Sequence, residues 1–133
     1  MNNNSILIID DNDSIRDALS WSLSNKGYES ITAANGQEAW DILEKNESPA
    51  LILLDIMMPV MDGYEFRRRQ NAHARFSKIH TVIVSARQNL ELSLHSNEML
   101  LPKPFDLHFL LKIIKERMDF LFQWDAKKLE EYV

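Results

Sequence analysis

Five polar residues have the chemical types and the positions to form a site for phosphoryl chemistry. Asp10, Asp11 and Asp55 supply three carboxylates, Ser85 a hydroxyl and Lys103 an ammonium group, and each lies at the end of a short apolar run. Three carboxylates in one place repel one another unless a cation joins them, and hard oxygen ligands without His or Cys favour Mg²⁺, with Mn²⁺ as the alternative. A lysine opposite such an ion suits an anion that bridges to the metal, most simply a phosphoryl group.

Short apolar segments, several of them β-branched, place these five residues. Runs of this kind, bounded by polar residues, are typical of strands that are buried on both faces of a parallel sheet. The predicted strands are residues 6–9, 28–33, 51–54, 81–84 and 99–101. The second strand is the weakest of the set, and the fifth stops at Pro102.

Segments with helical spacing of apolar residues alternate with the strands. The first predicted helix begins after an N-cap at Asp13 or Ser14 and ends at Gly27. The second covers residues 37–45, the third begins near 62–63, and the fourth is a short helix over 88–96. The fifth runs from an N-cap at Asp106 to about residue 121. The order is therefore a strand followed by a helix, repeated five times. This order predicts an α/β fold, a flavodoxin-like doubly wound sheet of five parallel strands with helices on both faces. Ligands bind outside the carboxyl ends of the strands in such sheets.

Composition and charge exclude several other classes of protein. The chain has 133 residues, a length that fits one domain, and its 45% apolar and 26% charged residues are typical of a globular protein. It has no cysteine, which excludes disulfides, Cys-ligated metals and a thiol nucleophile. A net charge of -5 argues against binding of nucleic acid through phosphate contacts. No membrane span or secretory signal is visible, so we expect a cytoplasmic location without membrane contact.

Each of the five residues also has a simpler interpretation when it is taken alone. An Asp after a strand is commonly a turn residue or a helix N-cap, and this covers Asp10 by itself. A lone serine such as Ser85 is commonly a loop residue, and a lysine between two prolines, as Lys103 is, can be solvated. Their joint placement at one edge of the predicted sheet is what favours chemistry over these alternatives.

Five motifs, in this order along the chain, make the sequence resemble the receiver domain of two-component response regulators. The run Leu-Asp-Ile-Met-Met-Pro-Val-Met-Asp-Gly over 54–63 is highly specific for that family, whereas a lone Lys-Pro-Phe is weak. The other motifs are Ile-Ile-Asp-Asp-Asn over 8–12, Ala-Asn-Gly-Gln-Glu-Ala over 34–39, Val-Ser-Ala over 84–86 and Leu-Pro-Lys-Pro-Phe over 101–105. Together they cover nearly the whole chain to about residue 121.

The resemblance implies a role for each acidic residue. Asp55 is the implied phosphoacceptor, a carboxylate nucleophile that forms an aspartyl phosphate. Asp11 and Asp55 are the implied direct ligands of Mg²⁺, together with the backbone carbonyl of Met57. Asp10 is implied to act through a metal-bound water.

The same resemblance implies roles for the residues that follow the fourth and fifth strands. Lys103 pairs with one phosphoryl oxygen, and the Ser85 hydroxyl donates a hydrogen bond to another. Arg87 borders the phosphoryl group or points to solvent. The peptide bond between Lys103 and Pro104 is expected to be cis, which aims the lysine inward.

The implied function is that of a two-component signalling receiver rather than an enzyme with an outside substrate. A sensor histidine kinase or a histidine phosphotransfer protein supplies the phosphoryl group, and the domain catalyses only its own phosphorylation and dephosphorylation. Phosphorylation then shifts the face made by the fourth helix, the fifth strand and the fifth helix, which controls a partner protein or an output domain outside this chain.

Two features depart from the family pattern. The position three residues before the lysine is commonly aromatic and is Leu100 here. The stretch from Ser85 to Lys103 is several residues short, which predicts a short or poorly formed fourth helix. These departures keep one alternative open, a receiver-shaped interaction module that does not signal by phosphorylation. A Mg²⁺-dependent phosphatase of the haloacid dehalogenase type is disfavoured, because those enzymes need a second Asp where this chain has Met57.

The C-terminal part of the chain has more than one interpretation. We expect a receiver domain over 1–122 and an extension over 123–133 that is a helix continuation, a tail or the start of a linker. Phe120, Leu121, Phe122 and Trp124 carry apolar character past the usual end of the fifth helix. They are expected to cap the core, to form a homodimer surface, or to lead toward an output domain.

Overall fold

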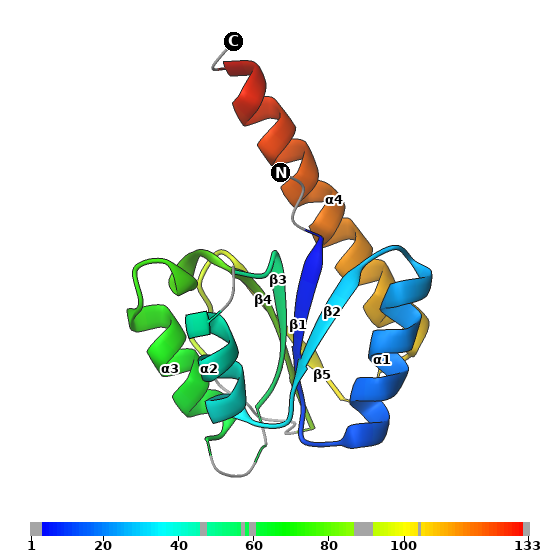
Figure 1. Ribbon diagram of the computed structural model, residues 1–133, viewed down its shortest axis with the longest axis vertical. Helices are drawn as coiled ribbons and strands as arrows, with labels where there is room; N and C mark the ends of the chain where they lie inside the picture. Colours follow the sequence, from blue (N-terminus) through cyan, green and yellow to red (C-terminus); the bar gives the residue numbers. More distant parts are fainter. Residues whose placement is uncertain are drawn as a thin grey trace.

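The computed structural model describes residues 4–45, 48–56, 58, 61–86, 92–103 and 105–131, with side chains up to residue 123. Strands and helices alternate along the chain up to β4, which β5 and then α4 follow among the described elements (Figure 1). Each of the five predicted strands is present, with bounds within one residue of those expected. The elements are β1 Ser5–Ile9, α1 Asp13–Asn25, β2 Glu29–Ala33, α2 Gly36–Lys45, β3 Leu51–Asp55, α3 Gly63–Ala72, the 3₁₀ turn η1 Phe76–Lys78, β4 His80–Ser85, β5 Glu98–Pro102 and α4 Leu107–Glu131.

The five strands form one parallel sheet in the order β2-β1-β3-β4-β5, which confirms the predicted fold class. The strand order reverses between β1 and β3, and this reversal is the topological switch point at which doubly wound sheets bind their ligands. Ile9 pairs with Leu54 in the register of these two strands. The carboxyl ends of β1 and β3 are therefore level, and the acidic residues that follow or end them are neighbours.

Two apolar clusters cover the two faces of the sheet. Helices α2 and α3 lie on one face, and α1 and α4 lie on the other (Figure 1). One cluster packs alternate strand residues such as Ile9 and Leu54 against α2 and α3. The other packs the residues between them, such as Ile8 and Leu53, against α1 and α4. Because side chains of a strand alternate between faces, each central strand contributes to both clusters, and this explains why these strands are continuously apolar.

Helix α1 begins one residue earlier than predicted, because its N-cap is Asn12 rather than Asp13 or Ser14. The Asn12 side chain accepts a hydrogen bond from the Ile15 amide at 3.0 Å, and its backbone is extended. Asn, Asp and Ser are all good caps, so three consecutive candidates do not identify the boundary. The predicted end at Gly27 agrees with the structure, where this residue has φ of 87° directly after the helix. Helix α3 begins at Gly63, within the predicted range 62–63, and its N-cap Asp62 accepts a hydrogen bond from the Glu65 amide at 2.9 Å.

The predicted helix over 88–96 is wrong wherever the structure describes that stretch. Residues 92–95 have no regular secondary structure, and residues 96 and 97 form a turn. Leu92 and Leu100 pack against the cluster on the α2–α3 face instead. The connection from β4 to β5 therefore covers the sheet with individual side chains over its described part.

An arginine from α3 holds the described part of this connection in place. Arg67 makes two hydrogen bonds of 2.7 Å to the carboxylate of Glu98 and a third of 2.6 Å to the carbonyl of Ser93. The Glu98 side chain is only 2% exposed, and it also accepts from the His95 amide at 2.9 Å. Burial on its own raises the pKa of Glu98, but the hydrogen bonds from Arg67 and His95 lower it below the ordinary 4.5. This group of contacts ties α3 to the first residue of β5.

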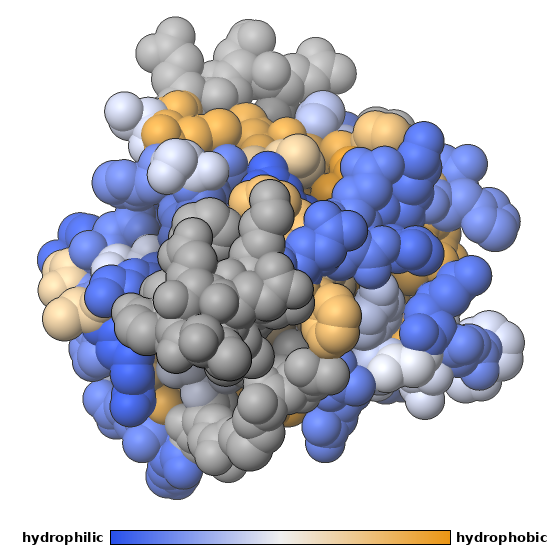
Figure 2. All heavy atoms as spheres, turned by 90° about the horizontal axis from the view of Figure 1, so that it is seen from above, coloured by the Kyte–Doolittle hydropathy of each residue, from blue (hydrophilic) through white to orange (hydrophobic). Residues whose placement is uncertain are grey.

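Helix α4 is 25 residues long and continues without a break past residue 122. Its first half packs on the sheet through buried residues such as Leu110 and Ile114, and the remainder projects from the body (Figure 1). Phe120 and Phe122 are about half exposed on the projecting part. Figure 2 looks onto this end of the molecule, where the coloured side chains are mainly hydrophilic with apolar groups between them. Among the described residues, none of the helices combines the length and hydropathy that a membrane crossing needs.

Candidate functional site

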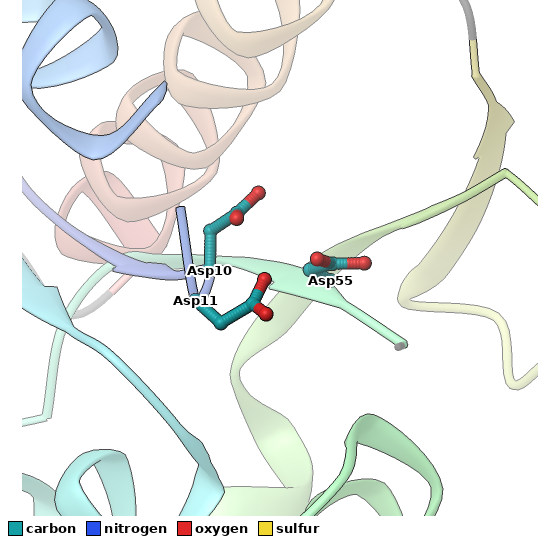
Figure 3. A group of neighbouring side chains, drawn as sticks. All are labelled: Asp10, Asp11 and Asp55. Atoms are coloured by element: carbon teal, nitrogen blue, oxygen red, sulfur yellow. The ribbon is translucent and has the colours of Figure 1, made fainter. Parts of the chain in front are cut away.

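Three carboxylates meet at the switch point of the sheet. Asp10 and Asp11 directly follow β1 and Asp55 ends β3, and each offers an oxygen that lies within 4.8 Å of the others (Figure 3). Asp10 and Asp55 are both 4% exposed, whereas Asp11 is exposed to solvent. The strand ends alone bring these side chains together, because β1 and β3 are adjacent and in register.

Lys103 is the cation that faces this acidic group. Its Nζ lies 3.7 Å from a carboxylate oxygen of Asp10 and 3.7 Å from one of Asp55. One ammonium against three ionised carboxylates leaves a formal local charge of -2. Like charges this close repel one another, so the arrangement favours a divalent cation beside the lysine.

The acidic group passes a test of fit for Mg²⁺ or Mn²⁺ on its donor set. All three ligands are hard carboxylate oxygens, and the described neighbourhood supplies no His or Cys that would favour zinc. Oxygens on opposite sides of one Mg²⁺ are about 4 Å apart, so oxygens within 4.8 Å of one another need only small rotations to share an ion.

Local hydrogen bonds hold Asp10 in its position. Its amide donates to the carbonyl of Ala33 on β2 at 3.1 Å, and its carboxylate accepts from the Asn12 amide at 2.9 Å. Arg16 also donates to the Asp10 carbonyl, while its other guanidinium nitrogen pairs with Asp13. The sequence analysis did not identify Asn12 as a support of the site, although its position directly after two aspartates is the signal that points to it.

Ser85 lies on the strand next to Asp55 and is 1% exposed. Asp55 pairs with Val84, so Ser85 lies one residue beyond that pairing at the same edge of the sheet. The Ser85 carbonyl accepts a hydrogen bond of 2.7 Å from the Lys103 amide. The backbones of the predicted hydroxyl donor and the predicted ammonium donor are thus joined directly.

A cavity of about 600 Å³ lies beside the acidic group, between β1, helix α1 and the start of α4. Asp10 and Lys103 are the charged residues that line it, while Asp11, Asp55 and Ser85 do not. Its other walls are apolar, because they come from Ile8, Ile9, Ile15, Ala18, Leu19, Leu53, Val84, Ala86, Phe105 and Leu107. An apolar neighbourhood strengthens the attraction between Lys103 and the carboxylates, because it lowers the local dielectric.

Gly63 is a second support that the sequence analysis did not assign to the site. Its amide donates to the Ile56 carbonyl at 2.9 Å, so the start of α3 rests on the backbone just after the third aspartate. A Cβ at this position would lie 2.5 Å from the Ile56 Cα and 2.6 Å from the Asp55 carbonyl oxygen. Only a glycine allows this approach.

We expect Gly63→Ala to destabilise the fold by about 1–3 kcal/mol, because the clash is with backbone that cannot rotate away. It should also slow any reaction at Asp55, since relief of the clash moves that carbonyl. Chemical denaturation measures the first effect. Gly27→Ala is the control: its added Cβ meets nothing within 4 Å, and only the positive φ makes it unfavourable. Wild-type stability in Gly63→Ala would contradict the close approach.

Three residues with predicted roles lie outside the described residues. They are Met57 with its carbonyl ligand, Arg87 beside the phosphoryl group, and Pro104 with its cis peptide. Their roles stay predictions. Of the five residues that opened the sequence analysis, the structure brings Asp10, Asp11, Asp55 and Lys103 into one group and places Ser85 on the adjoining strand end.

Comparison with known families gives a match that covers most of the chain. The model of the response regulator receiver domain matches residues 6–115. Sporulation initiation phosphotransferase F from Bacillus subtilis is 36% identical over 120 residues, which are 87% of this chain and 94% of that protein. Response regulator Rre1 from Synechocystis is 34% identical over 116 residues. This chain spans about half the length of Rre1.

Solved structures of the same kind share the fold. A CheY-like response regulator receiver domain protein from Methanospirillum hungatei aligns with a TM-score of 0.74 and 28% identity, over 90% of this chain and 97% of the other. Chemotaxis response regulator CheY4 from Vibrio cholerae aligns with a TM-score of 0.72 and 28% identity, over 85% of this chain and 97% of the other.

Proposed function

We infer that Asp55 is the phosphoacceptor of this chain, which belongs to the response regulator receiver domain family and so to two-component signal transduction. The observation that carries the proposal is the setting of this carboxylate. It is buried at the switch point, an ammonium nitrogen lies 3.7 Å from its oxygen, and two further carboxylates are within 4.8 Å. This combination suits a nucleophile that must accept a group carrying negative charge.

The chemical step is a transfer between two side chains. A carboxylate oxygen of Asp55 attacks the phosphorus of a phosphohistidine on a sensor histidine kinase or a histidine phosphotransfer protein. The new O–P bond forms as the P–N bond breaks, and the imidazole nitrogen keeps the electron pair and takes up a proton from solvent. The phosphoryl group keeps its charge, so the site gains negative charge on Asp55 as the step proceeds.

Lys103 and Ser85 stabilise that charge in our proposal. The ammonium of Lys103 already faces Asp55 and offsets the charge that grows on one phosphoryl oxygen. Ser85, on the adjoining strand end, donates a hydrogen bond from its hydroxyl to a second phosphoryl oxygen. The hydrogen bond from the Lys103 amide to the Ser85 carbonyl keeps both donors on one rigid edge of the sheet.

Mg²⁺, or Mn²⁺ in its place, is the proposed cofactor. Asp10, Asp11 and Asp55 would hold it, together with the carbonyl of Met57. The ion supplies positive charge that lets the three carboxylates and the incoming anion occupy one place.

The signal is proposed to leave the site through the described part of the β4–β5 connection, β5 and α4. Lys103 directly follows β5, and Leu100 on the same strand packs with Leu92 against the α2–α3 face. Leu100 stands at the position where the receiver family commonly has an aromatic residue. A shift of Lys103 toward a phosphoryl group would pull on β5 and on the start of α4, and the altered surface would control a downstream protein or an output domain.

We propose that the domain acts in the cytoplasm, does not contact nucleic acid or membrane itself, and turns over no outside substrate. Half-exposed Phe120 and Phe122 on the projecting part of α4 are the surface on which a homodimer would form. The alternative of a receiver-shaped interaction module without phosphorylation remains the second candidate, and the missing fourth-helix structure over residues 92–95 is what favours it.

Incubation with acetyl phosphate tests the proposal and separates the two candidates. We expect the chain to gain one phosphoryl group in the presence of Mg²⁺, seen as a mass shift of the intact protein, and to gain none with excess EDTA. The physical reason is that the acidic group repels the incoming anion until a divalent ion neutralises it. An unmodified mass in Mg²⁺, in protein that is folded by circular dichroism, would favour the interaction module.

A further inference from the structure

A second hollow in the molecule is lined by basic side chains, in contrast to the acidic group at the switch point. It has a volume of about 250 Å³ and lies between the turn that joins α1 to β2 and one face of α4. Three lysines and a histidine contribute to it, together with two partly buried side chains that form an apolar floor. The lining residues are Lys26, Tyr28, His108, Leu111, Lys112 and Lys115. We call this hollow the basic groove.

The basic residues of α4 fall on a single helix face. His108, Lys112 and Lys115 are spaced by four and three residues, so they lie above one another along about 10 Å of the helix. Lys26 faces them from the end of α1. The groove therefore has three basic side chains on α4 and a fourth, Lys26, from the end of α1.

The charges of the groove are only partly compensated. Lys115 pairs with Asp119 at 2.7 Å, and this contact raises the pKa of Lys115. Within the described part of the chain, Lys26 and Lys112 have no carboxylate oxygen within 4.0 Å. Three lysines against one aspartate leave a formal charge of +2, in a protein whose net charge is -5. The groove thus concentrates positive charge against the sign of the whole molecule.

Tyr28 adds a hydrogen-bond donor and a flat surface. Burial raises the pKa of its hydroxyl, with the nearby Asp119 acting in the same direction and Lys115 in the opposite one. The hydroxyl is therefore protonated at neutral pH and available to donate. Its ring and Leu111 belong to the partly buried residues that pack on the α1–α4 face, so the floor of the groove is held in place.

From this arrangement we propose that the basic groove is a binding site for a small polyanion of the diphosphate class, distinct from the phosphoacceptor site. Two or more phosphoryl groups in a row match the line of cationic groups along α4, and Lys26 closes over them from α1. The proposal goes beyond the phosphoacceptor function and does not depend on it. The same chemistry has two sources, an inorganic diphosphate or the phosphate chain of a nucleotide.

Titration of ¹⁵N-labelled protein with sodium pyrophosphate tests the groove, in buffer that contains EDTA so that no divalent ion recruits the probe to Asp55. We expect saturable chemical-shift changes at the amides of Lys26, Tyr28, Leu111 and Lys112. The double variant K26Q/K112Q should bind roughly tenfold more weakly, since it removes the two uncompensated charges. The double variant K45Q/K78Q removes two exposed lysines elsewhere and should bind as wild type does.

Further titrations distinguish an inorganic diphosphate from a nucleotide as the ligand, and they define the results that would contradict the proposed site. Tighter binding of ATP than of pyrophosphate would assign the groove to nucleotides through contact with the Tyr28 ring, and equal binding would assign it to the phosphate chain alone. Non-saturable shifts spread over all surface lysines would overturn the proposal, as would unchanged affinity in K26Q/K112Q. A short DNA duplex that binds the groove more tightly than pyrophosphate would overturn it too, because the ligand would then be a macromolecule. The variant Asp55→Asn should bind pyrophosphate normally, which keeps this test independent of the phosphoacceptor assignment.

Discussion

The variant Asp55→Asn is expected to lose acetyl phosphate labelling completely while it keeps its fold. An amide of the same shape has no anionic oxygen to attack phosphorus, so no aspartyl phosphate forms at this position. The substitution also removes one of three crowded carboxylates and leaves Lys103 beside Asp10 at 3.7 Å. Because like-charge repulsion falls, we expect the free energy of unfolding to be equal to or above that of the wild type.

Asp62→Asn is the matched control, with the same chemical change in the same sequence motif. Asp62 is exposed and caps α3 through a hydrogen bond from the Glu65 amide, and asparagine caps a helix as well as aspartate does. Intact-protein mass spectrometry after incubation with Mg²⁺ and acetyl phosphate gives the readout. Labelling that persists in Asp55→Asn and maps to another carboxylate would sink the assignment of the phosphoacceptor.

The second large effect concerns the ion pair that ties α3 to β5. We expect Arg67→Met to lower the free energy of unfolding by about 3–5 kcal/mol, because it leaves the carboxylate of Glu98 buried without its partner. Replacing both residues, in R67M/E98M, should recover most of that loss, since apolar side chains of similar size remove the unpaired charge. Urea denaturation of the four proteins in this cycle measures the coupling between the two positions.

Arg68→Met provides the control on the neighbouring residue. Arg68 pairs with Glu65 on the helix surface and its side chain is 70% exposed, so its loss should cost far less stability than the loss of Arg67. A cost for Arg67→Met as small as that for Arg68→Met would show that the buried pair contributes no more than the exposed one.

The pH dependence of the same variants gives a second readout with a defined sign. The folded-state pKa of Glu98 lies below its ordinary 4.5, so its contribution is fully present above about pH 4.5 and is lost as the pH falls through the folded-state value. In Arg67→Met the unpaired carboxylate prefers to be protonated, so acid stabilises that variant relative to neutral pH. The gap between wild type and Arg67→Met should therefore begin to narrow above pH 4.5, as the variant takes up a proton at Glu98, and should narrow further below pH 4.5, as the wild type loses its ion pair.

The strands, and the placement of the five polar residues at one edge of the sheet, could be predicted because both depend on local features of the sequence. A parallel strand such as β3 is buried on both faces, so its run of Leu51 to Leu54 is visible without any partner. The residues that follow buried strands of one sheet must share an edge. That rule placed Asp10, Asp55 and Lys103 together before any distance was known.

The features that the sequence did not reveal depend on contacts between distant residues. Arg67 and Glu98 are 31 residues apart, and an arginine inside an Arg-Arg-Arg run is ordinarily a solvated surface residue. The predicted helix is wrong over the described residues 92–96 for a related reason, because helical spacing over a few residues is a weak signal and the contacts of Arg67 hold this described part in place. The close approach of Gly63 to Asp55 could not be predicted either, because a glycine in a motif does not indicate which part of the backbone it contacts.

The projecting half of α4 gives the fold a mechanical property. About 13 of its 25 residues follow Met118, the last described residue of the helix that is buried, and they correspond to roughly 20 Å of helix, of which only Leu121 still packs against the α1–α4 cluster among the described side chains. A tilt of about 10° where the helix is anchored would carry its far end through roughly 3 Å. Helix α4 starts only four residues after Lys103, so it is a lever arm whose short end adjoins the acidic pocket and whose long end reaches well outside the body.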